Sequence, residues 1–307
     1  MVGDLCYEDF NMKALLVANP KAGRVRGEAG VARIEQRLCA AGMHVVTLAP
    51  SKPEQMADAL RAELVGESPE RVRVVVAGGD GTINSALPAL AGTGVALAVL
   101  PVGSANVLAR ELGVPCGLEA AVQVASRGRP RRIDLGMANG KPFALMAGMG
   151  FDAEVIGSVA QDIKNVVGSF AYVGRGLHLL ATYPTTRFHI DADGETVEID
   201  AWLAVVANAN RYTYRWRLAP QARVDDGWLD LCLFSSSSLA GTAGQVIAAL
   251  SGRHSTHPGV RHVRAKSFTF DCEPPVAFQL DGDYVGQTPV RVHVASEALT
   301  VMVPAED

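Results

Sequence analysis

Residues 72–84 read VRVVVAGGDGTIN, an apolar β-branched run that passes through a glycine turn into a helical pattern. The valines at 74–76 are typical of a strand buried on both faces of a parallel sheet. At the glycines the chain must turn sharply, and bare backbone N–H groups there can approach an anion. We expect Thr82 to cap a helix that begins at Ile83. A carboxylate, Asp80, lies inside this anion-friendly turn, which favours phosphate chemistry with a metal ion or a proton handled nearby.

Composition excludes several classes of protein. The chain has 307 residues, enough for one large or two ordinary domains, and a net charge of −4, which argues against a general nucleic-acid binder. Its five cysteines form no CxxC pair and fit a reducing compartment. We find no signal peptide at the N-terminus and no run approaching the roughly 18 apolar residues of a spanning helix. We therefore expect a cytoplasmic protein that can still touch the inner face of a membrane.

The first part of the chain alternates strands and helices. Strands are predicted at 13–18, 44–49, 72–77 and 95–101, with helices between them. This order predicts an α/β domain whose parallel sheet is covered by helices and binds ligands at the carboxyl ends of the strands. Three strands end in glycine-containing loops, which read NPKAG at 19–23, GGDGT at 78–82 and PVGSAN at 101–106. Because these loops meet at one sheet edge, they predict a phosphate-binding cradle.

After residue 135 the runs become short and β-like. Asp193-Gly194 is a hairpin signal, and helical patterns interrupt the strands near 152–183 and 238–251. We predict an N-terminal extension at 1–12, an α/β nucleotide-binding domain at 13–135 and a β-rich, lipid-binding domain at 136–295. A strand within 296–305 could pair back onto the first domain, and the sequence leaves this open.

The three loops, in this order and spacing, resemble those of the diacylglycerol kinase catalytic-domain family, which includes soluble bacterial lipid kinases related to diacylglycerol and sphingosine kinases. The resemblance extends from about residue 13 to residue 303, and GGDGTIN is its most specific element. It implies an NAD-kinase- and phosphofructokinase-like α/β domain followed by a β-sandwich, with the active site between the two.

The resemblance implies transfer of the γ-phosphate of ATP to a lipid hydroxyl, with Mg²⁺ as the metal. Asp80 would orient the magnesium ion or its waters, because a hard cation prefers carboxylate and water oxygens. The resemblance assigns nucleotide contacts to the three loops and to the end of the second strand. These residues are Asn19, Thr47, Gly78, Gly79, Asp80, Gly81, Thr82, Ile83, Asn84, Gly103, Ser104 and Asn106.

A distant segment supplies the candidate proton acceptor. Residues 278–283 read FQLDGD and match the Leu-Asp-Gly-Glu segment of the family, with Asp in place of Glu at the last position. From the residues alone, the segment is equally typical of an Asp-Gly hairpin turn between two strands. Both Asp281 and Asp283 are candidates for the base; the position that is acidic in the family favours Asp283.

A second magnesium site is implied by residues 219–230, which read APQARVDDGWLD. In the family, such a segment accompanies a structural magnesium ion. Here Asp226 would supply a carboxylate, and Arg223 and Trp228 would supply backbone carbonyls. The alternative is a solvated acidic turn.

Two further segments are relevant to how the protein contacts a membrane or a lipid substrate. Apolar residues recur at helical spacing over 155–183, which fits either a membrane-facing lip for a lipid substrate or a helix packed on the sandwich. The segment Arg211–Arg217 is bulky and cationic where relatives carry glycines, so it either alters substrate access or forms an exposed strand. We expect transient contact with a membrane surface; a homodimer is left open.

Three other functions are weighed against a lipid kinase. An NAD kinase also uses GGDGT, but we find no Thr-Pro-Thr-Gly-Ser-Thr-like segment in the second domain. A phosphofructokinase is disfavoured because no TIDND-like stretch is present. A catalytically silent lipid- or nucleotide-binding regulator would have little physical reason to keep carboxylates at positions 80, 226, 281 and 283.

Overall fold

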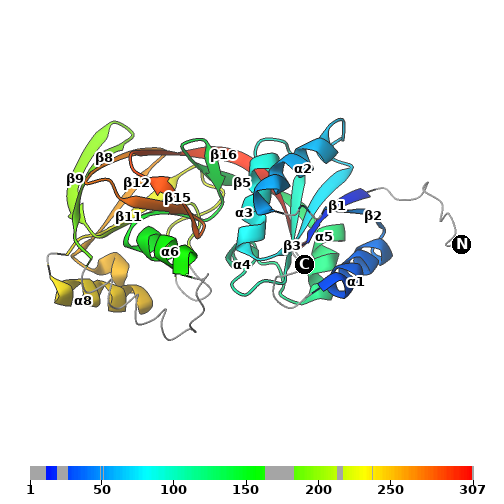
Figure 1. The fold of residues 1–307 in the computed structure, drawn as a ribbon, viewed down its shortest axis with the longest axis horizontal. Helices are drawn as coiled ribbons and strands as arrows, with labels where there is room; N and C mark the ends of the chain where they lie inside the picture. Colours follow the sequence, from blue (N-terminus) through cyan, green and yellow to red (C-terminus); the bar gives the residue numbers. More distant parts are fainter. Residues whose placement is uncertain are drawn as a thin grey trace, which may run out of the picture. The chain divides into compact units, whose positions relative to one another are not determined.

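A computed structural model describes residues 12–18, 27–48, 50, 52–162, 183–212, 217–236 and 238–305. The chain divides into two compact units (Figure 1). The N-terminal unit consists of Met1–Ile133 with Glu297–Asp307, and the C-terminal unit consists of Asp134–Ser296. The first is an α/β unit with a parallel sheet and the second is built from antiparallel sheets, which confirms the predicted fold class.

The N-terminal unit alternates strands and helices, as its hydrophobic pattern predicts. Its elements are β1 (Met12–Ala18), α1 (Gly27–Ala40), β2 (Met43–Leu48), a 3₁₀ turn η1 (Pro53–Gln55), α2 (Met56–Leu64), β3 (Val72–Gly78), α3 (Asp80–Leu90), β4 (Ala96–Pro101), α4 (Val107–Glu111) and α5 (Leu118–Arg127). The strands lie in the order β2-β1-β3-β4, and all neighbours are parallel. Strands β3 and β4 are almost entirely buried, as expected for a sheet covered on both faces.

Chain connectivity explains how the helices cover this sheet. The chain steps from β1 outward to β2 and then crosses back to β3 and β4. Because crossovers between parallel strands are right-handed, this reversal places α1 and α2 on opposite faces. The contacts agree, since α1 packs against α5 and α2 packs against α3 (Figure 1). The carboxyl ends of β3 and β4, next to the reversal, hold the glycine loops described below.

The C-terminal unit is a sandwich of two antiparallel sheets. Its elements are β6 (Lys141–Phe143), β7 (Met146–Gly150), α6 (Phe151–Asp162), β8 (Thr186–Ala192), β9 (Glu195–Ala201), β10 (Leu203–Ala207), β11 (Leu229–Phe234), α8 (Leu239–Leu250), a 3₁₀ turn η3 (His254–Thr256), β12 (Val260–Ala265), β13 (Ser267–Glu273), β14 (Ala277–Leu280) and β15 (Asp283–Gln287). One sheet has the order β12-β11-β10-β7-β14-β15, and the other includes β13-β8-β9. Phe188 and Phe268 from one sheet and Met149 and Leu231 from the other share a single buried core.

Two strands run from one unit into the other. They are β5 (Arg129–Ala138) and β16 (Val290–Val303). The first half of β16 pairs antiparallel with β13, and its last part pairs parallel with β4 through Thr300↔Ala96 and Val301↔Leu97. The end of the chain therefore pairs with the N-terminal unit, a contact that the sequence left open.

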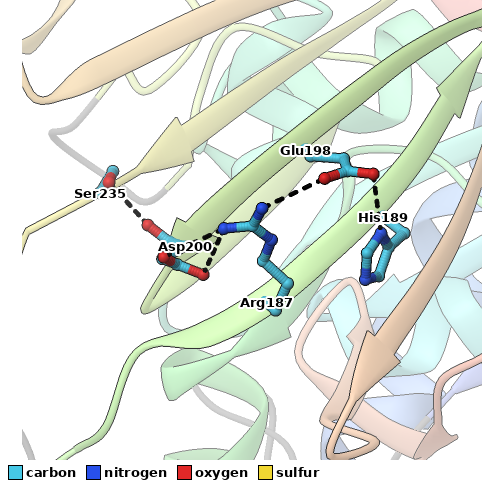
Figure 2. A network of polar contacts seen from close by, with 5 residues as sticks. All are labelled: Arg187, His189, Glu198, Asp200 and Ser235. Carbon is cyan, nitrogen blue, oxygen red and sulfur yellow. Dashed lines mark hydrogen bonds and ion pairs between the residues drawn. The ribbon is translucent and has the colours of Figure 1, made fainter.

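The β8–β9 hairpin shows how the sandwich protects an edge. Asp193 and Gly194 have positive φ, as the predicted two-residue turn requires, and β8 alternates buried and exposed residues. On its exposed face, Arg187 lies opposite Asp200 and contacts Glu198 at 3.1 Å, while His189 contacts Glu198 at 3.4 Å (Figure 2). Charged side chains on an edge strand discourage pairing with another chain. We attribute a structural role to this network.

None of the helices in the described ranges has both the length and the apolar character needed to cross a bilayer. The helix predicted near 152–183 is present as α6 up to Asp162, and residues 163–182 lie outside the described ranges.

Candidate active site

The turn between β3 and α3 is a direct entry into the helix. The helix begins at Asp80, with Gly79 as its N-cap, and the backbone N–H groups of Thr82 and Ile83 both donate to the Gly79 carbonyl at 3.0 and 3.2 Å. The expectation that Thr82 caps a helix beginning at Ile83 is therefore wrong. Thr82 lies inside the first turn, because Gly79 is the N-cap and the helix already begins two residues before Thr82. The first-turn N–H groups of α3, an 11-residue helix, lie at the carboxyl end of β3.

Glycines in this region allow two loops to touch through their backbones. A Cβ on Gly103 would lie 2.5 Å from the Cα of Gly79, and a Cβ on Gly78 would lie 2.5 Å from the Thr82 side chain. The Gly103 N–H donates to the Gly78 carbonyl at 3.2 Å. The GGDGT and PVGSAN loops are thus brought together, and Gly103 is required for close approach rather than for an unusual φ.

The Asp80 carboxylate ties the same two loops together. Its oxygens accept the backbone N–H groups of Val107 and Leu108, both at 3.1 Å, at the start of α4. A carboxylate at a helix N-terminus satisfies otherwise unpaired donors and opposes the positive end of the helix dipole. Each oxygen uses one lone pair in this way and keeps another, so the donor set still fits a hydrated magnesium ion.

Asn106 shapes the PVGSAN loop from within. It adopts a left-handed conformation with φ of 50°, and its Nδ2 donates to the carbonyls of Pro101 and Gly103 at 3.1 and 2.9 Å. The side chain is buried, and its Oδ1 accepts no hydrogen bond from any described residue. The Asn106 side chain therefore stabilises the loop that carries Gly103.

The remaining nucleotide candidates lie in different environments. Thr47 donates its hydroxyl to Glu35 of α1, and Ile83 is buried in the core. Gly81 and Ser104 are exposed, and Asn84 is half-buried. Asn19 lies outside the described residues. Ile83 can therefore contribute only its backbone to a ligand.

The FQLDGD segment is a hairpin turn between β14 and β15. Asp281 and Gly282 both have positive φ, as the Asp-Gly hairpin interpretation requires. The Asp281 carboxylate accepts three backbone N–H groups, from Ala144 at 2.7 Å, Leu145 at 2.9 Å and Met146 at 2.7 Å. Asp283 is exposed at the start of β15. The two carboxylates that the sequence left as alternatives thus have different surroundings, one enclosed by backbone donors and one open to solvent.

At the proposed structural magnesium site, the Asp226 carboxylate already has a cationic partner. Its Oδ2 pairs with the guanidinium of Arg264, and its Oδ1 accepts the backbone N–H of Trp228 at 3.1 Å. The cations of Arg264 and Lys266 lie over the Trp228 ring, 5.5 and 5.1 Å from its centroid. The Arg223 side chain turns to Asp225 at 3.5 Å. No cluster of three or more His, Cys, Asp or Glu residues suited to a metal occurs in the described ranges, and the magnesium role of Arg223, Asp226 and Trp228 stays a prediction.

Asp152 is a buried acid that the sequence analysis missed. It lies in the first turn of α6, and burial raises its pKa to about 6, although hydrogen bonds from Gln279, Ala153 and Tyr212 act in the opposite direction. The signal was available, since GMGFDAEV at 148–155 repeats the pattern of a buried strand that passes through glycine into an acidic first helical turn.

The comparisons with known proteins match both units. The model of the diacylglycerol kinase catalytic domain matches residues 13–138, and that of the YegS C-terminal NAD kinase beta sandwich-like domain matches residues 146–303, about half of the chain. The chain belongs to the diacylglycerol kinase catalytic-domain family. This assignment confirms the resemblance carried by the glycine loops and supports a phosphotransferase at family level.

Two curated proteins are similar in sequence to most of this chain. An uncharacterized protein of Synechocystis sp., sll0036, is 31% identical over 239 residues, and the chain spans 55% of its length. A diacylglycerol kinase of Bacillus subtilis is 29% identical over 297 residues, which cover 96% of this chain and 97% of that protein.

Solved structures show the same fold. A diacylglycerol kinase from Bacillus anthracis superposes with a TM-score of 0.71 at 23% identity and covers 95% of this chain. The yeast NADH kinase in complex with NADH superposes with a TM-score of 0.53 at 12% identity and covers 98% of this chain.

Proposed function

We propose that this chain is a lipid kinase that transfers the γ-phosphate of ATP to a hydroxyl of a diacylglycerol- or sphingosine-like lipid. The observation that carries the proposal is the pair of backbone-packed glycine loops fastened by Asp80, in a chain that belongs to this family. Such loops present N–H groups without side-chain obstruction, which suits the oxygens of a polyphosphate.

The N-terminal unit is assigned the phosphate donor. Backbone N–H groups of the β3–α3 turn would bind phosphate oxygens, and the close contact of Gly79 with Gly103 keeps the turn rigid. Asp80 would hold a hydrated magnesium ion through its remaining lone pairs, and that ion would neutralise charge on the phosphates. The hydrogen bonds from Val107 and Leu108 fix the Asp80 carboxylate in direction before any ligand binds.

The C-terminal unit is assigned the proton acceptor, and we propose Asp283 for this role. The lipid oxygen forms a bond to the γ-phosphorus as the bond from that phosphorus to the β-phosphate oxygen breaks, and the hydroxyl proton passes to the Asp283 carboxylate. Asp281 is less suited, because three backbone N–H groups occupy its oxygens. It instead holds the base of the turn in place.

We further propose that the protein acts in the cytoplasm and reaches its substrate by transient contact with a membrane surface. A lipid hydroxyl lies at the interface between water and the bilayer, so the active site must reach that interface in each catalytic cycle.

A substrate panel tests the proposed function. The purified chain is incubated with ATP labelled in the γ-phosphate, Mg²⁺ and mixed micelles that contain diacylglycerol, monoacylglycerol, sphingosine, ceramide or phosphatidylglycerol, with NAD as a separate acceptor. The proposal predicts labelled lipid with at least one of these acceptors. Label in NAD alone would show an NAD-kinase-like enzyme, and label in no acceptor would favour the silent regulator.

A further inference from the structure

Asp152 is linked to the candidate base through a single buried side chain. The Nε2 of Gln279 donates to Asp152 Oδ2 at 3.0 Å, and the Oε1 of the same amide accepts the backbone N–H of Gly282 at 2.7 Å. Gly282 is the residue between Asp281 and Asp283. Both Asp152 and Gln279 are more than 90% buried. A continuous chain of hydrogen bonds therefore runs from the start of α6 to the turn that carries Asp283.

The sandwich makes room for this chain of contacts at one position. Gly148 on β7 lies opposite Gln279 on β14. A Cβ on Gly148 would lie 2.0 Å from Asp152 Oδ2 and 2.6 Å from Gln279 Nε2. The absence of a side chain at residue 148 is thus what allows the carboxylate and the amide to meet inside the unit.

The polarity of the contact fixes the orientation of the amide. An ionised carboxylate only accepts hydrogen bonds, so it must face the NH₂ group of Gln279, and the carbonyl oxygen then faces Gly282. Asp152 Oδ1 accepts the Ala153 N–H at 2.7 Å, and the Tyr212 hydroxyl donates to Oδ2 at 3.3 Å. The hydrogen bonds that these described residues make with Asp152 are therefore all donated to it, as the ionised form requires.

A buried carboxylate is a costly way to stabilise a fold. Replacing a buried charged group by well-packed apolar residues often leaves the stability of a protein unchanged or raises it. The network is therefore better explained by the position of the turn that it fixes. The ladder of β14 and β15 shifts register between Phe278 and Gln279, next to the turn. Such irregularities re-aim side chains near functional sites.

We propose that Gln279 and Asp152 are positioning residues that hold the Gly282 amide and thereby set the direction in which Asp283 meets the lipid hydroxyl. The inference rests on the proposed function and deepens it, since neither residue touches the reacting atoms. Gln279 acts directly on the turn, and Asp152 acts through Gln279.

Other titratable groups surround Asp152. Strands β7 and β14, which pack against α6, carry none, while β15 carries Asp283 and Tyr284 and the turn carries Asp281. Glu154 lies on α6 itself. Burial raises the pKa of Tyr183 to about 12, with further contributions from Glu154 and Asp152. Tyr183 therefore stays neutral near pH 7.

The matched pair of variants is Gln279→Leu and Gln245→Leu. Gln245 is also a buried glutamine of the C-terminal unit, and its amide bonds Ser235, Gly259 and Trp202 rather than the turn. With the lipid acceptor that the wild type uses, we expect Gln279→Leu to lower kcat about 10- to 100-fold with the KM for ATP within about twofold. We expect Gln245→Leu to lose at least as much stability and to keep the wild-type kcat.

Amide hydrogen exchange supplies a readout that needs no activity. Exchange of residues 279–287, followed by mass spectrometry, should accelerate in Gln279→Leu and in Asp152→Asn but stay at the wild-type rate in Gln245→Leu. Faster exchange with an unchanged kcat in Gln279→Leu, or an equal loss of kcat in Gln245→Leu, would overturn the positioning role. Unchanged exchange in Gln279→Leu would overturn the network itself. If the wild type labels no lipid, the proposed function is wrong. Amide hydrogen exchange then still decides whether Gln279 holds the turn.

Discussion

Gly103 lies directly against Gly79, so that a Cβ on Gly103 would approach the Gly79 Cα to 2.5 Å. The two residues belong to loops that follow neighbouring parallel strands, β3 and β4. This contact explains why residue 103 is a glycine, and it joins the two loops of the proposed phosphate site.

Gly103→Ala should therefore damage both stability and ATP binding. The added methyl group would meet the Gly79 backbone and the Asn106 side-chain oxygen, and overpacking of this kind costs about 1–3 kcal/mol. Gly81→Ala is the matched control, because a Cβ at residue 81 meets nothing within 4 Å and alanine favours a helix. Denaturant unfolding of both variants, with ATP titration of Gly103→Ala against the wild type, tests the prediction. Equal stability of the two variants would show that the close contact is not a constraint.

We predict two separable roles for Asp80: its hydrogen bonds stabilise the fold, and its carboxylate serves catalysis by holding the magnesium ion. Asp80→Ala removes the acceptors for Val107 and Leu108 and should lower the free energy of unfolding by about 1–3 kcal/mol. Asp80→Asn keeps one acceptor oxygen, so we expect a smaller loss of stability with turnover still reduced on the order of 100-fold or more. Unfolding curves and kcat are measured for both. Normal turnover in a folded Asp80→Asn variant would remove Asp80 from the catalytic account.

Substitution of the two acids of the Asp-Gly-Asp segment should affect different properties, turnover for one and stability for the other. Asp283 is exposed, so Asp283→Asn should leave stability unchanged and lower kcat by about 10²- to 10⁴-fold, with little effect on the KM for ATP. Asp281→Asn places an NH₂ group against backbone donors and should cost about 1–3 kcal/mol of stability. If Asp281→Asn instead loses turnover while its stability is kept, the proton acceptor is Asp281.

The raised pKa of Asp152 predicts how stability depends on pH. The folded pKa of about 6 lies above the ordinary value of 3.8, so the folded state binds the proton more tightly. The free energy of unfolding should then fall as pH rises from about 4 to about 6, by about 3 kcal/mol at most from this group. Unfolding of the wild type and of Asp152→Asn across this range isolates the contribution. Parallel curves for the two proteins would contradict it.

Magnesium alone should not stabilise the C-terminal unit through Asp226. The Arg264 guanidinium already occupies this carboxylate, so the melting temperature without nucleotide should respond to Mg²⁺ equally in the wild type and in Asp226→Asn. A rise in the wild type that Asp226→Asn abolishes would show that the ion displaces Arg264. The predicted metal role of Asp226 would then be correct.

Local patterns were enough to predict the fold class, because β-branched runs followed by glycine identify buried parallel strands without knowledge of their partners. The helix start was misplaced for a local reason as well. Threonine is a common N-cap, but Gly79 takes that role and Asp80 opens the helix. The pairing of Thr300 with Ala96 could not be predicted, since register over such a separation depends on the packed sheet.

The candidate site was predicted in its residue types and not in its contacts. The sequence indicates that Asp80 lies among phosphate-binding glycines, but its hydrogen bonds to Val107 and Leu108 depend on how two loops pack. Likewise, Asp152 and Gln279 are 127 positions apart in the chain, and only the neighbouring strands β7 and β14 bring them together.

The central claim is that phosphate leaves ATP for a lipid hydroxyl with Asp283 as the proton acceptor. The direct measurement is the rate at which label from γ-labelled ATP enters a lipid acceptor in mixed micelles, for the wild type and for Asp283→Asn at equal concentration of folded protein. The account predicts labelled lipid phosphate from the wild type and a rate lower by a factor of about 100 or more from Asp283→Asn. Equal rates for the two proteins, or a wild type that labels none of the lipids, would contradict it.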